Sequence, residues 1–193
     1  MKVYIKLKKI VTLIINTIFT YKSRSVKYYN QYSLRYYFQK YGEEKIGPTG
    51  CGPFSCAIVA STLLEKEICP VSVAKWSVEY GFYEYQHGSY HSLIPKYLTY
   101  LGLKCEDLGN SVEKLEHLLE QKNSMGIILC RKGAFSKGNH FVAVGKKGNY
   151  FKVYNSSNVF DCYKKYDKHY LENALLSERI YIGPIWYISR EEI

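Results

Sequence analysis

Residues 50–64 of the sequence read GCGPFSCAIVASTLL, and this stretch decides the fold. From Pro53 to Leu64 the chain is apolar, long enough for a helix and free of interior breakers. Proline suits the first turn of a helix, where its missing N–H costs nothing. A helix that is apolar on all sides is a buried one. The sequence therefore predicts a central, buried helix with Cys51 at its N-terminal end.

The position of Cys51 also suggests chemistry. The nucleophilic form of cysteine is the thiolate, and the N-terminus of a helix stabilises negative charge. The flanking glycines, Gly50 and Gly52, would let a substrate backbone approach closely. We expect Cys51 to have a lowered pKa and Cys56, inside the apolar run, to be an inert core residue. A structural thiol at a helix cap is the alternative for Cys51.

The rest of the chain divides into helices followed by strands. Gly148-Asn149 separates two of the strands and indicates a hairpin. Helices first and strands later predict an α+β fold, with a helical layer packed on an antiparallel sheet. The expected helices are Val71–Tyr80, Leu93–Leu101, Ser111–Lys122 and Asp167–Leu176, and the expected strands are Met125–Cys130, His140–Gly145, Tyr150–Tyr154, Ile180–Ile182 and Ile185–Ile188.

Among the five histidines, His140 has the most informative position because it opens a predicted strand. A histidine at the mouth of a strand can reach a helix N-terminus while the strand fixes its ring. With the turn at Gly148-Asn149, the residue opposite His140 falls near position 157, within two residues of Asn155. An asparagine there could accept the imidazole N–H and hold the useful tautomer.

Composition sets limits on the class of protein. The 193 residues fit one domain, with 47% apolar and 23% charged residues, which excludes wholesale disorder. The net charge is +10, but residues 1–45 carry ten Lys and Arg against two Glu and so account for +8 of it. Most of the chain is near neutral, which argues against nucleic-acid binding. Six cysteines without regular spacing do not make a disulfide scaffold.

Residues 1–24 form a basic and partly apolar head in front of a domain expected over residues 25–193. Four lysines (Lys2, Lys6, Lys8 and Lys9) precede an apolar run from Ile10 to Phe19, as in a secretory signal, although no small-residue cleavage site follows. The sequence slightly favours a secreted or membrane-anchored protein, with membrane contact through the head. The alternative is an amphipathic helix that packs on the domain.

These motifs together resemble a known family. The sequence is similar to the papain-fold peptidases that process bacteriocins at a double-glycine leader (cysteine family thirty-nine), and more so to their free-standing bacterial relatives. The resemblance covers roughly residues 25–193 and keeps the family's order. It is carried by Tyr29-Asn30-Gln31, Tyr41-Gly42, Gly50-Cys51-Gly52-Pro53, Ala74-Lys75-Trp76, Gly81-Phe82-Tyr83, Gly138-Asn139-His140-Phe141-Val142 and Val153-Tyr154-Asn155.

The resemblance implies a papain-like fold and a set of site residues. Cys51 would be the nucleophile, and His140 the general base and acid. Asn155 stands where the relatives usually have Asp and would orient the imidazole without a full charge. Gln31 would supply a side-chain amide to the oxyanion hole. Two departures are that Ser156 replaces the usual Pro, and that the usual Trp after the glutamine is absent.

The expected activity is that of a cysteine peptidase or amidohydrolase that acts on peptides or proteins through a thioester. It requires no metal or organic cofactor, and the sequence contains no GxGxxG, P-loop or zinc-ligand spacing. Two alternatives stay open: a catalytically inactive binding module on the same scaffold, and an acyl transferase with an amine as acceptor.

Overall fold

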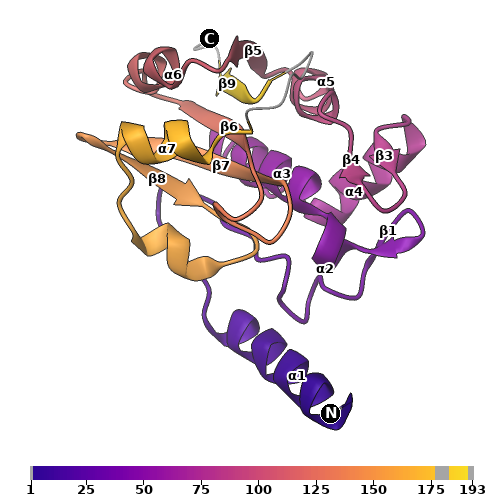
Figure 1. Ribbon diagram of the computed structural model, residues 1–193. Coiled ribbons are helices and arrows are strands. Elements are labelled where there is room, and N and C mark those ends of the chain that lie inside the picture. Colours follow the sequence, from indigo (N-terminus) through magenta and orange to yellow (C-terminus); the bar gives the residue numbers. More distant parts are fainter. Residues whose placement is uncertain (1, 177–182, 191–193) are drawn as a thin grey trace.

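The computed structural model describes residues 2–176 and 183–190, so the strand expected at Ile180–Ile182 lies outside the described residues (Figure 1). The helices are α1 (Lys2–Ile18), α2 (Ile46–Thr49), α3 (Cys51–Leu63), α4 (Pro70–Glu79), α5 (Leu93–Tyr100), α6 (Val112–Leu118), α7 (Lys168–Ala174) and the 3-10 helix η1 (Val159–Tyr163). The strands are β1 (Lys40–Tyr41), β2 (Glu44–Lys45), β3 (Tyr83–Glu84), β4 (Gly88–Ser89), β5 (Lys104–Gly109), β6 (Ser124–Cys130), β7 (His140–Lys147), β8 (Tyr150–Tyr154) and β9 (Ile185–Ser189).

The main sheet has five strands in the order β5-β9-β6-β7-β8, and all of its neighbouring strands are antiparallel. Two further pairs, β1 with β2 and β3 with β4, form small hairpins outside this sheet. The predicted α+β class is confirmed.

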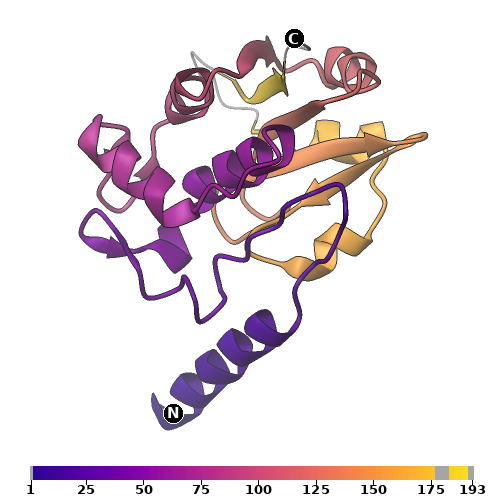
Figure 2. The ribbon, with the colours of Figure 1, turned by 180° about the vertical axis from the view of Figure 1, so that it is seen from behind.

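Helix α3 lies against one face of the main sheet, where it contacts β6 and β7 (Figure 2). Eleven of its thirteen residues are buried, because α4 and α5 cover its remaining sides. The apolar run therefore forms the predicted central helix. The helix begins at Cys51, two residues before the expected Pro53.

The sheet is covered on both faces, whereas the sequence pattern suggested a single helical layer. Residues of α6 and α7 pack with Ile128, Val142 and Val144 on the face opposite to α3. The alternate residues Ile127, Leu129 and Ala143 face α3. Two covered faces explain why β6 and the first part of β7 are apolar at nearly every position, since neither face of those strands contacts water.

The β7–β8 hairpin confirms the predicted register. Lys147 pairs with Tyr150, so Gly148-Asn149 forms a two-residue turn. The pairing continues to Ala143 opposite Tyr154. Extending the same register by three residues places position 157 opposite His140, as the sequence predicted. His140 and Asn155 thus lie at the same open end of the hairpin.

Candidate active site

Cys51 is the first residue of α3, and tight packing fixes its position. A Cβ on the next residue, Gly52, would lie 2.5 Å from the side-chain oxygen of Ser89, so only glycine lets the first turn approach β4 this closely. Cys51 itself is half-buried. The first N–H groups of a helix have no partner inside that helix. The thiol therefore lies beside donors that can stabilise a negative charge.

The surroundings of Cys51 favour its thiolate. Burial alone would raise the pKa of the Cys51 thiol, but a hydrogen bond to His140 and the charge of that ring lower it. The backbone N–H groups of Phe141 and Gly52 add to this effect. The net result is a pKa below the ordinary thiol value, as the sequence predicted. Cys56, one turn deeper in the same helix, shows the opposite behaviour, because burial raises its pKa well above the ordinary value.

His140 connects the thiol to the sheet. It is the first residue of β7, is 4% exposed, and its Nε2 lies 2.8 Å from Oδ1 of Asn155. Because an amide oxygen only accepts hydrogen bonds, Nε2 must carry a proton. The other ring nitrogen, Nδ1, is therefore the one that can form a hydrogen bond with the Cys51 thiol. In the neutral ring, Nδ1 is the unprotonated nitrogen and can accept the thiol proton.

The charge state of His140 follows from the same contacts. Burial lowers the pKa of His140, but the hydrogen bond and the charge of Cys51 raise it, and so do Asn155 and the carboxylate of Asp161. The net shift is upward. A thiol whose pKa is lowered beside an imidazole whose pKa is raised favours a thiolate–imidazolium pair.

Asn155 follows directly after β8 and is fully buried. Its Oδ1 accepts hydrogen bonds from His140 and from both the N–H and the hydroxyl of Ser157, at 2.8, 3.0 and 2.9 Å. Its Nδ2 donates to the carbonyl oxygen of Phe135 at 3.1 Å and to Oδ2 of Asp161 at 2.9 Å. Both the oxygen and the NH2 group of the amide therefore have hydrogen-bond partners.

Asp161, in η1, is a site residue that sequence reasoning missed. It is 5% exposed and accepts hydrogen bonds from four side chains. Besides Asn155, these are Asn158 at 3.0 Å, Lys164 at 2.7 Å and Tyr166 at 3.1 Å. The signal that could have found it is an N-cap residue, Asn158, followed by an acidic residue in the first turn of a helix, where negative charge is stabilised.

Gln31 is buried beside the loop that follows β8. Its Nε2 donates to the carbonyl oxygen of Gly47 at 2.7 Å, and its Oε1 accepts from the hydroxyl of Ser156 at 2.7 Å. Its backbone N–H donates to the carbonyl oxygen of Ser156 at 2.8 Å. Gln31 therefore joins the residue after Asn155 to the segment just before Cys51. Ser156 provides the hydroxyl for this link.

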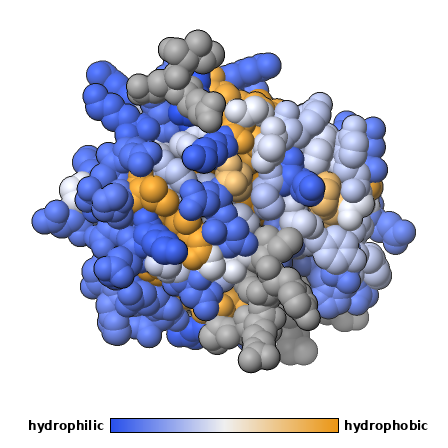
Figure 3. Space-filling view, turned by 90° about the horizontal axis from the view of Figure 1, so that it is seen from above, coloured by the Kyte–Doolittle hydropathy of each residue, from blue (hydrophilic) through white to orange (hydrophobic). Residues whose placement is uncertain are grey.

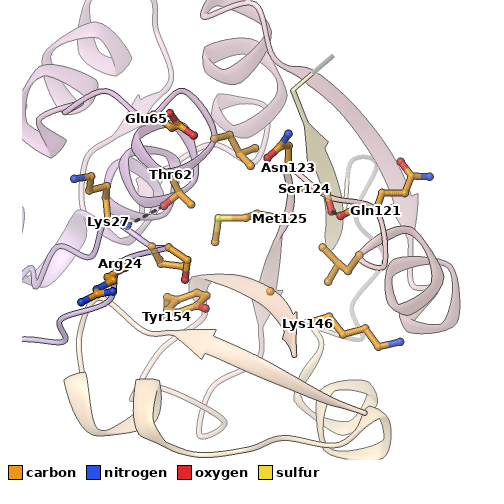
Figure 4. A pocket seen from close by; sticks show the side chains of 15 residues that line it. Arg24, Lys27, Thr62, Glu65, Gln121, Asn123, Ser124, Met125, Lys146 and Tyr154 are labelled. Atoms are coloured by element: carbon orange, nitrogen blue, oxygen red, sulfur yellow. Dashed lines mark hydrogen bonds between the residues drawn. The ribbon is translucent and has the colours of Figure 1, made fainter. Parts of the chain in front are cut away.

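The other chemical features lie elsewhere. No group of His, Cys, Asp and Glu among the described residues could hold a metal ion. A cavity of about 590 Å³ lies beside the last turn of α3, between residues 24–27 and strands β6 to β8 (Figure 4). Arg24, Lys27 and Lys146 line it. Because Cys51 begins the same helix, this cavity is at the far end of α3 from the thiol and is separate from the site.

No protein-family model matches the sequence, and no curated protein is significantly similar to it.

Proposed function

We propose that this chain is a papain-like cysteine peptidase or amidohydrolase, with Cys51 as nucleophile and His140 as general base and acid. The observation that carries the proposal is the continuous set of contacts from the Cys51 thiol through His140 to Asn155. Nucleophilic catalysis requires a nucleophile that is hydrogen-bonded to a base, with a third group that orients the base.

The first half of the reaction forms an acyl-enzyme. The Cys51 thiolate attacks the carbonyl carbon of a peptide or amide bond, and the carbonyl oxygen becomes an oxyanion. The His140 imidazolium gives its Nδ1 proton to the leaving amine as the C–N bond breaks. An acyl thioester on Cys51 and a free amine result.

Water completes the reaction. His140, now neutral, takes a proton from water, and the resulting hydroxide attacks the thioester carbonyl carbon. The C–S bond breaks, a carboxylic acid leaves, and the thiolate returns beside the imidazolium. The backbone N–H of Cys51 and the second N–H of the Gln31 amide are the donors we assign to the oxyanion, and a donor of this kind is typically worth about 3 kcal/mol of barrier.

The direct test is digestion of a peptide library by the full-length wild type, by Cys51→Ala and by the matched control Cys69→Ala. Cys69 is also a half-buried thiol at a helix N-terminus. We expect cleavage with the wild type and Cys69→Ala, and none with Cys51→Ala. Cleavage that persists in Cys51→Ala would refute the mechanism.

A second readout separates an enzyme from an inactive binding module. Iodoacetamide should alkylate Cys51 rapidly near neutral pH if the thiolate–imidazolium pair forms. Slow alkylation together with no cleavage of any peptide would support the binding module instead.

A further inference from the structure

Asp161 lies directly behind Asn155, and its carboxylate is buried. We propose that Asp161 is a positioning residue for the Cys51–His140 pair and acts through Asn155, so that Asn155 and Asp161 together do what a single aspartate would do. This inference rests on the proposed function.

The hydrogen-bond partners of Asn155 fix the orientation of its amide. Rotating it by 180° would place its NH2 group against the N–H donors of His140 and Ser157, and its oxygen against the carbonyl of Phe135 and the carboxylate of Asp161. The contacts with the backbone N–H of Ser157, the carbonyl of Phe135 and the carboxylate of Asp161 would become repulsive whatever the tautomer of His140, so these partners allow one orientation. Asp161 contributes the charged acceptor, and hydrogen bonds to charged groups are roughly twice as strong as neutral ones.

Asp161 also supplies the negative charge that Asn155 lacks. An asparagine at position 155 accepts the imidazole N–H but brings no negative charge to balance an imidazolium. The Asp161 carboxylate supplies that charge at the next hydrogen bond, 2.9 Å beyond the amide. Charge interactions between buried groups are screened less than those at the surface, and Asp161 raises the pKa of His140, although burial of the ring opposes this.

Other titratable and charged groups surround the network. Lys164 pairs with Asp161 from the exposed side, with a side chain that is 59% exposed, so its charge is partly screened by water. The groups that face His140 and Asp161 from the packed elements are Cys51 of α3, Cys130 of β6, Tyr28 of the N-terminal segment, Cys162 of η1, and Lys164 and Tyr166 of the segment after η1.

The competing explanation is that Asp161 only stabilises the turn that contains η1. Asp161 accepts hydrogen bonds from Asn158, Lys164 and Tyr166, which are all in or next to that turn. Tyr166→Phe is therefore the matched control. It removes a hydrogen bond to Oδ1 of Asp161 and leaves the bond between Oδ2 and Asn155 intact.

The experiment measures the rate of Cys51 alkylation by iodoacetamide as a function of pH, with folding checked by circular dichroism. The full-length proteins are the wild type, Asp161→Asn, Tyr166→Phe and the double variant Asn155→Asp with Asp161→Asn. The double variant exchanges the amide and the carboxylate, so that a carboxylate faces His140 directly.

We expect Asp161→Asn to raise the apparent pKa of the Cys51 thiol by about one unit and to slow its alkylation at pH 6 about tenfold. The double variant should recover most of that rate, and Tyr166→Phe should match the wild type. A wild-type profile in Asp161→Asn, or an equal loss in Tyr166→Phe, would overturn the inference.

If Asp161→Asn does not fold, the double variant still tests the role of the carboxylate. If the double variant folds but its thiol titrates in the ordinary range, the inference fails. These results are distinct from failure of the proposed function, in which the wild-type thiol itself reacts slowly and Cys51→Ala loses no activity.

An independent observation concerns α1, whose apolar side faces away from the domain. Figure 1 shows the helix extending from the body of the molecule. Ile10, Val11, Ile14, Ile15 and Ile18 are between 38% and 68% exposed, at the spacing of one helix face.

The other side of α1 holds the helix to the domain. Leu13 is buried, the hydroxyl of Thr17 accepts the N–H of Leu34 at 2.8 Å, and Oδ1 of Asn16 accepts from the Asn30 side chain at 2.9 Å. The helix is thus attached by one buried leucine and two polar side chains, while its wider apolar face stays exposed, which is the reverse of the expected packing of an amphipathic helix on a domain. Opposite α1, the surface in Figure 3 is mostly hydrophilic, with narrow hydrophobic strips.

We propose that the exposed face of α1 binds the surface of a bilayer that contains anionic lipids. Residues 1–24 contain six Lys and Arg and no Asp or Glu, which matches a negative surface. A helix with one apolar face and nearby basic residues lies in the plane of the interface. Within the described part of the chain, no helix has both the length and the apolar character needed to cross a membrane.

The test is co-sedimentation of the full-length protein with vesicles of phosphatidylcholine, alone or with 30% phosphatidylglycerol. We expect at least about tenfold stronger binding to the anionic vesicles, and a loss of about tenfold or more in Ile14→Asp. Val78→Asp, at a similarly exposed aliphatic residue on α4, should bind like the wild type.

Three results would overturn this second proposal. The first is an absence of preference for anionic vesicles, and the second is unchanged binding in Ile14→Asp. The third is a dimer in solution that Ile14→Asp dissociates, without vesicle binding, which would make the face an interface between two copies.

Discussion

The starts of α3 and α4 are alike in sequence terms and different in chemistry. Each has a half-buried cysteine at the helix N-terminus and a proline in the first turn, with Cys51 at α3 and Cys69 at α4. Cys51 faces an imidazole from β7. Cys69 lies instead among the tyrosines Tyr29, Tyr36 and Tyr97.

This contrast separates two contributions to thiol reactivity. A helix N-terminus favours a thiolate by typically 0.3–1 kcal/mol at an exposed position, and both cysteines have one. The imidazole adds a proton acceptor and, once protonated, a full positive charge. Cys51 therefore differs from Cys69 in having the imidazole that β7 supplies. Changes to that part of the sheet should alter the reactivity of the Cys51 thiol and leave that of Cys69 unaffected.

The largest expected effect follows from removal of the imidazole. His140→Ala should lower kcat for peptide hydrolysis by about 10⁴-fold or more, because members of a catalytic unit act together. Alkylation of Cys51 near neutral pH should slow as well, while that of Cys69 should not change. Site-resolved mass spectrometry after timed iodoacetamide treatment measures both thiols in one sample. Faster alkylation of Cys69 would show a general loss of structure, and equal slowing of the two thiols would contradict a specific role for the imidazole.

The oxyanion assignment predicts the next largest effect. Gln31→Ala should lower kcat about 10²-fold, with little change in the alkylation rate of Cys51, because the amide acts on the developing oxyanion and not on the thiol. Thermal unfolding of the variant serves as a control, since Gln31 also joins Ser156 to Gly47. A normal kcat in a folded variant would leave Gln31 with a structural role only.

The pH dependence of alkylation extends the comparison to Cys105 in β5. The hydrogen bond to His140 and the charge of that ring hold the pKa of the Cys51 thiol below its ordinary value, so its thiolate persists to lower pH than that of an ordinary thiol. Its rate should therefore begin to rise at lower pH than that of Cys105, whose pKa burial raises to about 12. At pH 7 the expected advantage is at least about tenfold, since each pKa unit changes the thiolate fraction tenfold. Overlapping profiles for the two thiols would contradict the ion pair.

The smallest effect is expected at Cys56. Its side chain is fully buried, and burial raises its pKa well above the ordinary value, so it is not a nucleophile. Cys56→Ala should leave kcat unchanged and lower the free energy of unfolding by about 1 kcal/mol, as a typical core truncation does. Urea denaturation and the peptide assay together check this, and a large loss of kcat would mean that Cys56 supports the site.

The central part of the fold could be predicted from the sequence because strong local patterns specify it. The apolar run after Cys51 predicted α3, and the Gly148-Asn149 turn predicted both the β7–β8 hairpin and its register. The start of the helix expected over Asp167–Leu176 was also correct, because Asp167 is the N-cap of α7 and its side chain accepts a hydrogen bond from the N–H of Tyr170. In each case a few adjacent residues carry the whole signal.

Other elements have no such local signal. β5 is an edge strand whose Lys104, Glu106 and Asp107 are exposed, so its sequence lacks the apolar character of a strand. The helix expected over Ser111–Lys122 ends earlier, at Leu118, where a turn begins. Asp161 was missed because its partners, Asn155, Asn158, Lys164 and Tyr166, lie within six residues of it but follow no recognised motif, and their side chains converge on it only because η1 turns the chain.

The tight turn at Gly148-Asn149 has one further consequence. It carries no chemistry, yet its length sets the alignment of two strands whose opposite ends hold His140 and the residues around Asn155. Surface turns usually accept extra residues at little cost, but a single inserted residue here would send alternate side chains of one strand to the wrong side of the sheet. The length of this loop therefore sets the alignment of His140, eight residues before Gly148, with Asn155, six residues after Asn149, and homologous chains that keep the site should keep the loop length.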